Sequence, residues 1–130
     1  MTSYLELADY LLIAERVLGL PAEVLARLDR IGLADSALAA PQAGLDGIEA
    51  HPDVETKAAV LCWHLVKNHP LPDGNKRCAF LATIEFIERN GGVWIPAPGD
   101  PDETDFVIRA VASGELTLED FRIWIAARCG

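Results

Sequence analysis

Cysteine is scarce in this chain, and long apolar runs are missing from it. The three cysteines are odd in number and show no C-x-x-C spacing, so neither a disulfide framework nor a zinc site is indicated: Cys62, Cys78 and Cys129. No run of about 18 apolar residues occurs, so we expect no membrane-spanning helix. The N-terminus carries acidic residues where a secretion signal would be apolar. We therefore expect a cytoplasmic protein.

The chain also has few positively charged residues. The chain has 11 Lys and Arg residues against 20 Asp and Glu residues, a formal net charge of −9. Because phosphate neutralisation supplies most non-specific affinity for nucleic acids, we expect no direct binding of DNA or RNA. The cations are unevenly spread, since Lys67, Lys76 and Arg77 are accompanied only by Asp73 within residues 64–77. That cationic stretch suits a small anionic ligand.

The remaining composition is that of a folded globular protein. Hydrophobic residues make up 51% of the 130 residues and charged residues 24%, which argues against disorder. The length matches one ordinary domain, and neither a repeat nor a long linker interrupts it. We expect residues 1–130 to form a single domain.

Apolar residues recur at helical spacing along most of the chain. They predict helices over residues 7–18, 21–28, 54–68, 75–90, 102–112 and 118–128. Asp35 or Ser36 is expected to cap a further short helix over residues 37–40, and Asp53 and Thr117 to cap two of the longer ones. Two prolines and two glycines predict a loop or small hairpin over residues 41–52. The expected fold is all-α, a compact helical bundle.

Residues 69–77, between two of the predicted helices, are crowded with reactive groups. Asn75, Lys76 and Arg77 open a helix, where unpaired N–H groups and the positive end of the helix dipole form an anion site. Lys76 and Arg77 add full charges suited to phosphate oxygens. Gly74 lets the main chain approach a ligand closely. We expect these four residues to bind nucleotide phosphates.

Two further side chains in this loop complete a set for phosphoryl transfer. Asp73 is a hard carboxylate beside the anion site and is the candidate ligand for Mg²⁺. His69 lies four residues upstream and is the candidate general base for an attacking hydroxyl. Base, metal ligand and anion site thus lie within nine residues, as phosphoryl transfer requires.

The loop resembles the signature of the Fic/Doc family, H-x-F-x-(D/E)-G-N-(G/K)-R. This chain reads His69-Pro-Leu71-Pro-Asp73-Gly-Asn-Lys-Arg77, with Leu71 in place of the family Phe. The resemblance extends over nearly the whole chain, including a segment similar to that preceding the target-binding flap of the family. It implies a small helical bundle in which residues 41–51 form that flap.

Two positions indicate the subfamily. Members that transfer AMP carry Gly where this chain has Lys76, and a second Arg where it has Phe80. Lys76 without that Arg resembles the Doc pattern. The pattern implies a toxin that transfers the γ-phosphoryl group of ATP, with Mg²⁺, to a Ser or Thr of elongation factor Tu. AMP transfer, or a catalytically weak binding role, stays open as an alternative.

No inhibitory S/T-x-x-x-E-(G/N) motif of self-restrained members appears in the sequence. The resemblance therefore implies restraint by a separate antitoxin of the Phd type. Phe121, Trp124 and Ile125 recur at helical spacing near the C-terminus, and we expect them to leave an apolar groove open. An amphipathic helix of the antitoxin would fill that groove.

Overall fold

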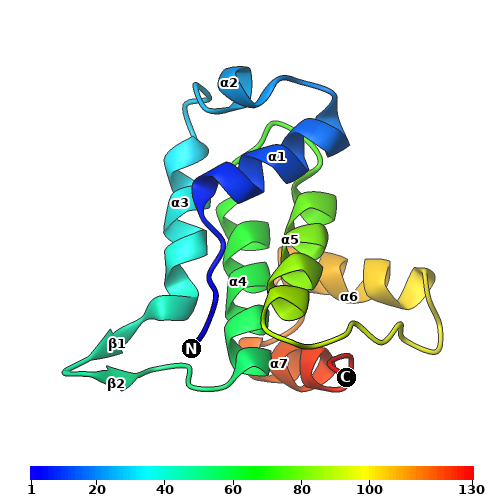
Figure 1. Ribbon diagram of the computed structural model, residues 1–130. Helices are drawn as coiled ribbons and strands as arrows, with labels where there is room; N and C mark the ends of the chain where they lie inside the picture. The colour runs from blue at the N-terminus through cyan, green and yellow to red at the C-terminus, as the bar shows by residue number, and fades with distance from the viewer.

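The computed structural model describes all 130 residues and is built almost wholly from helices (Figure 1). The helices are α1 (Leu7–Leu18), α2 (Ala22–Leu25), α3 (Ile31–Ala39), α4 (Val54–Asn68), α5 (Asn75–Arg89), α6 (Asp102–Ser113) and α7 (Leu118–Ala126). A 3₁₀ turn (Ala40–Gln42) leads into a hairpin of β1 (Gly44–Leu45) and β2 (Ile48–Glu49). The predicted all-α class is confirmed. None of the helices has the length and apolar character needed to cross a membrane.

Helix α4 runs through the centre of the molecule. It packs against α3, α5, α6 and α7, and also against the 3₁₀ turn. Its residues 58–62 are all buried, in agreement with the apolar sequence on nearly every side of this helix. Helices α3, α5, α6 and α7 therefore surround α4, whereas α1 packs on α3 and α5.

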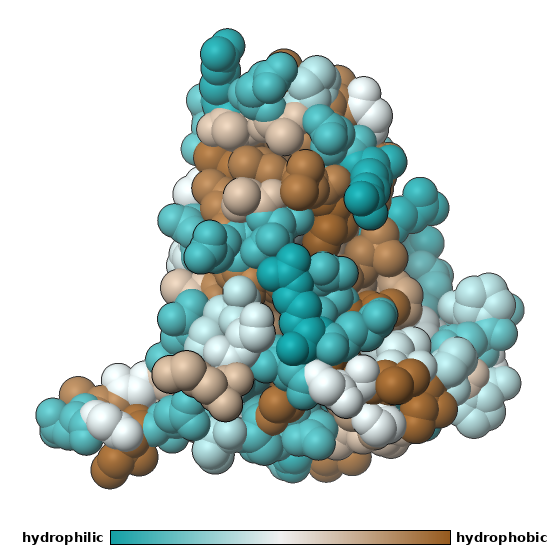
Figure 2. Space-filling model, in the orientation of Figure 1, coloured by the Kyte–Doolittle hydropathy of each residue, from teal (hydrophilic) through white to brown (hydrophobic).

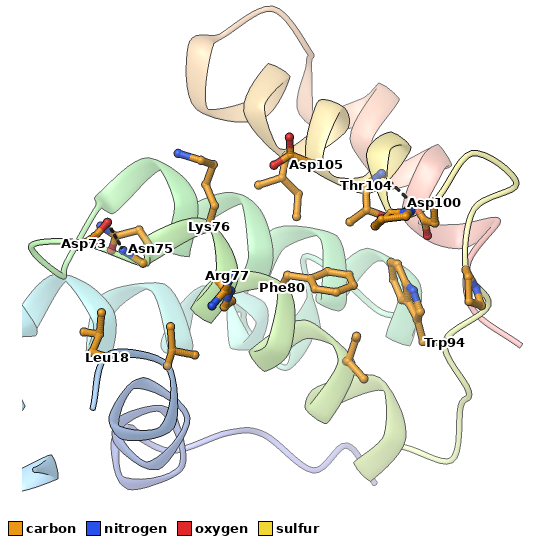
Figure 3. Close-up of a pocket in the computed structure, with 16 residues that line it drawn as sticks. Leu18, Asp73, Asn75, Lys76, Arg77, Phe80, Trp94, Asp100, Thr104 and Asp105 are labelled. Atoms are coloured by element: carbon orange, nitrogen blue, oxygen red, sulfur yellow. Dashed lines mark hydrogen bonds between the residues drawn. The ribbon is translucent and has the colours of Figure 1, made fainter. Parts of the chain in front are cut away.

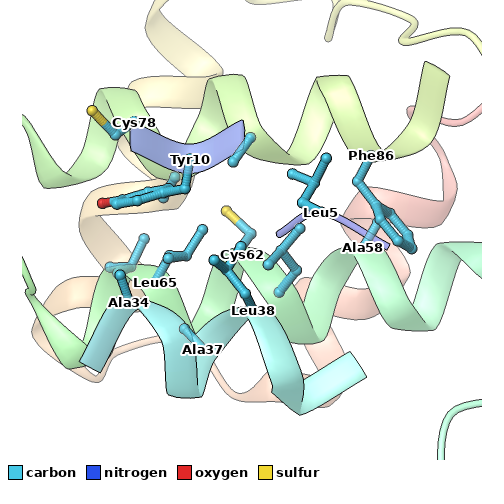
Figure 4. Packing of buried hydrophobic residues seen from close by; sticks show 14 of the residues in the cluster. Leu5, Tyr10, Ala34, Ala37, Leu38, Ala58, Cys62, Leu65, Cys78 and Phe86 are labelled. Carbon is cyan, nitrogen blue, oxygen red and sulfur yellow. The ribbon is translucent and has the colours of Figure 1, made fainter. Parts of the chain in front are cut away.

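One apolar cluster joins α1, α3, α4 and α5 (Figure 4). Tyr10 of α1 and Phe86 of α5 are among its largest fully buried side chains, and Leu65 of α4 lies in the same cluster. Small residues such as Ala34 and Ala37 of α3 bring that helix close to α4. This packing is what fixes α5 beside α4.

Several helix ends lie where the sequence predicts them. Asp53 accepts a hydrogen bond from the Thr56 N–H, and Thr117 accepts one from the Asp120 N–H. α1 ends at Gly19, which adopts the left-handed conformation with φ 71°. Residues 93–95 pair with the C-terminus through main-chain hydrogen bonds.

Two predicted helix starts are wrong. α3 begins at Ile31, so Asp35 and Ser36 lie inside it and cap nothing. The packing of Ala34, Ala37 and Leu38 on α4 sets this helix, and local capping signals are overridden. Pro21 precedes α2 as its N-cap residue, and α2 itself is one turn long.

The expected apolar groove at the C-terminus is also wrong. Phe121 and Ile125 are fully buried, because α7 packs onto α4 and closes the core. Phe121 lies against Trp63, with ring centroids 6.4 Å apart. Trp124 is partly exposed, but its indole N–H donates to Glu103 of α6 at 2.9 Å. No open strip for a partner helix remains on these residues.

Of the two structures expected for residues 41–52, a loop or a small hairpin, the hairpin is present, and it projects from the helical body (Figure 1). Asp46 and Gly47 both have positive φ, as a two-residue type I′ turn requires. Leu45 and Ile48 pair across the strands and are 77% and 74% exposed. The projecting segment carries apolar surface in Figure 2.

The N-cap of α4 generates a stability prediction. Asp53→Ala removes the acceptor for the Thr56 N–H and is expected to lower the free energy of unfolding by about 1 kcal/mol at neutral pH. The Thr56 hydrogen bond holds the pKa of Asp53 below its usual 3.8. The contribution is therefore complete above pH 3.8 and is lost as the pH falls through the lower folded-state pKa. Denaturant unfolding at several pH values measures it.

Asp29→Ala is the control, because Asp29 is exposed and forms no ion pair. A loss of stability in Asp53→Ala that is no larger than in this control would contradict the role of Asp53.

Candidate active site

The reactive loop spans the short gap between the end of α4 and the start of α5. Both of its ends adopt the left-handed conformation, with φ 50° at His69 and φ 74° at Gly74. A Cβ atom at Gly74 would lie 3.0 Å from Leu18 Cδ2 and 3.3 Å from Val17 Cγ1. Glycine at this position therefore permits both the turn and the close approach of α1.

The loop is pinned internally by the side chain of Asn75. Its Oδ1 accepts the Leu71 N–H at 2.9 Å, and its Nδ2 donates to the Leu71 carbonyl at 2.8 Å. Asn75 is 5% exposed and the Leu71 side chain is buried. Leu71, where the resembling family has Phe, thus still anchors the loop in the core. The Asn75 side chain is committed to the loop, and only its main-chain N–H faces a ligand site.

The first turn of α5 has the features of an open anion site. The N–H groups of Asn75, Lys76 and Arg77 have no acceptor, and the first paired amide is that of Cys78, which donates to the Gly74 carbonyl. Lys76 and Arg77 are exposed, and neither lies within ion-pair distance of a carboxylate. Both charges are therefore available to an incoming anion.

Asp73 borders this anion site. Its carboxylate is exposed, and Oδ1 accepts the Gly74 N–H at 2.8 Å. No cluster of three or more acidic, His or Cys side chains that would hold a metal by protein groups alone exists in the fold. A single carboxylate beside an anion site fits Mg²⁺, which commonly binds through one or two carboxylates together with phosphate oxygens and water.

A cavity of about 960 Å³ extends from the anion site between α1, α5 and α6 (Figure 3). One end is formed by Asp73, Lys76 and Arg77. Phe80 and Trp94 form an aromatic wall, with ring centroids 5.3 Å apart in an edge-on arrangement. A cationic end joined to an aromatic wall is complementary to a nucleotide, whose phosphates are anionic and whose base is flat.

The structure brings five of the six predicted site residues into the lining of this cavity: Asp73, Gly74, Asn75, Lys76 and Arg77. His69 is exposed and lies outside that lining, at the α4 end of the same loop. His69 therefore does not share the cavity with the other five residues.

Two residues, one at each end of α4, have contacts that the sequence did not predict. Arg30 donates from Nε to the His69 carbonyl at 3.1 Å and from Nη2 to the Asn68 carbonyl at 2.8 Å. Lys57 is fully buried, and its Nζ lies 3.3 Å from both the Pro41 carbonyl and Glu49 of β2. The sequence offered one sign of an unusual role for Lys57, namely that this basic residue lies in the apolar run of α4. It offered no sign of the contacts that Arg30 makes.

The buried Lys57 ties the hairpin to the helical body. Burial opposes the charged form, but Tyr4 and Glu49 outweigh it and raise the pKa of the Lys57 ammonium above its usual value. The two hydrogen bonds from Lys57 are the polar links between residues 41–50 and α4. They set the direction in which the hairpin leaves the body.

The pinned loop generates a prediction at Asn75. Asn75→Asp removes the donor to the Leu71 carbonyl, and the unpaired buried carbonyl is expected to cost about 1–3 kcal/mol in the free energy of unfolding. Affinity for Mg²⁺-ATP should fall as well, because a displaced loop no longer orients the first turn of α5. Denaturant unfolding and calorimetric titration measure the two effects. Glu88→Gln, on the exposed face of α5, is the control, and unchanged stability in Asn75→Asp would refute the pin.

Comparison with known proteins agrees with this geometry. The sequence model of the Fic/DOC family matches residues 4–87, which include the whole reactive loop and the hairpin. A curated relative, "Toxin Doc" of Mycolicibacterium smegmatis, is 36% identical over 126 residues, covering 97% of this chain and 93% of the relative. No solved structure matches the chain. The extent of the family match, together with a relative of this identity over nearly the full length, shows that the chain belongs to the Fic/DOC family.

Proposed function

We propose that this chain is the toxin of a toxin–antitoxin pair and that it transfers the γ-phosphoryl group of ATP to a Ser or Thr hydroxyl of a translation protein. The target expected from the Doc pattern is elongation factor Tu. The observation that carries the proposal is the anion site at the first turn of α5, where three free N–H groups and two unpaired cations meet one cavity. The name of the curated relative supports the toxin role.

The nucleotide would lie with its phosphates against Asn75, Lys76 and Arg77. These groups are fixed before the substrate arrives, so they stabilise the developing charge of the transferred group without reorganisation. Asp73 would hold Mg²⁺, which supplies neutralisation of phosphate charge when it is bound. Lys76 occupies space that AMP-transferring relatives leave to a Gly, and Phe80 brings an aromatic ring where those relatives have a cation. Both differences favour γ-phosphoryl transfer over AMP transfer.

His69 would act as the general base. Its imidazole takes the proton of the target hydroxyl as the oxygen attacks the γ-phosphorus. The bond between the γ-phosphorus and the β–γ bridging oxygen breaks, and ADP leaves with that oxygen. The reaction thus needs only ATP, the hydroxyl and a base that later releases its proton to water.

Residues 41–51, which contain the hairpin of β1 and β2, would receive the target. The two strands pair only with each other, so each outer edge has free N–H and C=O groups. An extended target segment would add to one edge by main-chain hydrogen bonds, and the exposed Leu45 and Ile48 would contact its side chains. A separate antitoxin of the Phd type would restrain the enzyme. The antitoxin would bind at a surface that does not include Phe121 and Ile125, because both are buried.

Label transfer from ATP tests this function directly. The purified chain is incubated with elongation factor Tu, Mg²⁺ and ATP labelled at either the γ or the α position. Label from the γ position alone is the expected result. Label from the α position would show AMP transfer, and label from neither would leave a binding role for the chain.

The same assay tests His69. His69→Asn removes the base but keeps a side chain that tolerates the left-handed conformation. We expect transfer to fall by about 10²–10⁴-fold with the fold intact, as for loss of a general base. His64→Gln is the control, because it removes an imidazole that lies within α4, away from the loop. A folded His69→Asn variant with the parental rate would exclude His69 as the base.

Lys76→Gly tests the choice between the two chemistries. Losing one phosphate ligand should lower γ-phosphoryl transfer by about ten-fold or more, as for a charge-assisted hydrogen bond of about 1.5–3 kcal/mol. AMP transfer should not appear, since Phe80 supplies no second cation. Lys67→Ala, outside the cavity, is the matched control. Strong α-label transfer by Lys76→Gly would show that Phe80 does not block that reaction.

A further inference from the structure

Arg30 makes both of its hydrogen bonds to the residues that end α4, although it precedes them by nearly forty positions in the sequence. It is the N-cap residue of α3, is exposed, and has no carboxylate within ion-pair distance. Its guanidinium donates to the carbonyl of His69 at 3.1 Å and to that of Asn68 at 2.8 Å. The Asn68 side chain donates in return to the Leu33 carbonyl of α3 at 3.0 Å. Three hydrogen bonds thus clamp the end of α4 to the start of α3.

His69 has an unusual main-chain conformation that needs such support. Its φ of 50° and ψ of 58° lie in the left-handed region, where Gly or Asn is the usual residue at a helix end. The last carbonyls of a helix have no partner within the helix. Arg30 supplies two donors and a positive charge at this negative end, so it stabilises a conformation that the His69 side chain disfavours.

The main chain of His69 decides where its imidazole points, because the Cα–Cβ bond turns with φ and ψ. The loop is fixed two residues later, where Leu71 is bound by the Asn75 side chain. Arg30 fixes the carbonyl of His69 itself. His69 is thereby held from both sides, on an exposed loop that would otherwise admit several orientations.

We propose that Arg30 is a positioning residue, which holds the main chain of His69 in the left-handed conformation and so directs its imidazole to the substrate hydroxyl. The inference rests on the proposed role of His69 as general base. Arg30 does not line the nucleotide cavity, so it acts through His69 and not on ATP. Loss of Arg30 therefore lowers turnover while the affinity for Mg²⁺-ATP stays unchanged.

The experiment compares the full-length chain with Arg30→Gln, Arg30→Lys and a matched control, Arg27→Gln. Arg27 is exposed, lies in the same segment and forms no ion pair. NMR follows the amide and ring signals of His69, identified by their loss in His69→Asn, and the amides of Lys76 and Arg77. Turnover is measured by label transfer and by growth arrest, and affinity by titration with Mg²⁺-ATP.

In Arg30→Gln we expect the His69 signals to shift or broaden while those of Lys76 and Arg77 stay in place. Turnover should fall by about 10- to 100-fold, as for a displaced reacting group, and affinity for Mg²⁺-ATP should stay within about two-fold of the parent because the cavity is unaltered. Arg30→Lys keeps the charge and N–H donors but lacks the planar guanidinium that reaches both carbonyls, so its values should lie between those of the parent and of Arg30→Gln. Arg27→Gln should match the parent in every measurement.

Unchanged His69 signals in Arg30→Gln would overturn the inference, and so would shifted signals with parental turnover. A joint loss of thermal stability, nucleotide affinity and turnover would show that Arg30 is only a helix cap, which also overturns it. Failure of the proposed function is recognised separately, in the unmodified chain, by the absence of label transfer from ATP. The His69 signals and growth arrest would then still judge the role of Arg30.

Discussion

The two hydrogen bonds between the Asn75 side chain and the main chain of Leu71 fix the geometry of the candidate site. They cross the loop that joins the two central helices, and they are buried, so water does not compete for either partner. Through them the loop becomes part of the first turn of α5. Asp73 and the free N–H groups beyond it therefore keep a fixed relation to each other, as a site without reorganisation requires.

The charge distribution is consistent with this arrangement. The chain as a whole is acidic, with a formal net charge of −9, yet Lys76 and Arg77 have no acidic partner. Of the nine other Lys and Arg residues, five are paired with carboxylates, among them Arg89 and Arg122, and four are not. Because charge effects at exposed sites fade within about 10 Å, an open cationic site at one helix end can bind a small anion on an acidic molecule.

Helix α4 supports the site at both of its ends. Near its start, the buried Lys57 binds the hairpin through the Pro41 carbonyl and Glu49. At its far end, Arg30 of the preceding segment binds the carbonyls of Asn68 and His69. The candidate base and the candidate target-binding hairpin are thus both attached to one rigid helix. A buried helix serves well here, since the core around it tolerates little displacement.

The sequence alone determined the helical class and the loop between α4 and α5 in which the candidate site residues lie. These follow from local signals, because helical periodicity, caps such as Asp53 and Thr117, and a nine-residue motif are all written within short stretches. Only the tertiary structure decided that Phe121 closes the core, that α3 begins before Asp35, and that Arg30 reaches the end of α4. Each of these depends on which elements pack together, and contacts between distant segments leave no periodic trace in either segment.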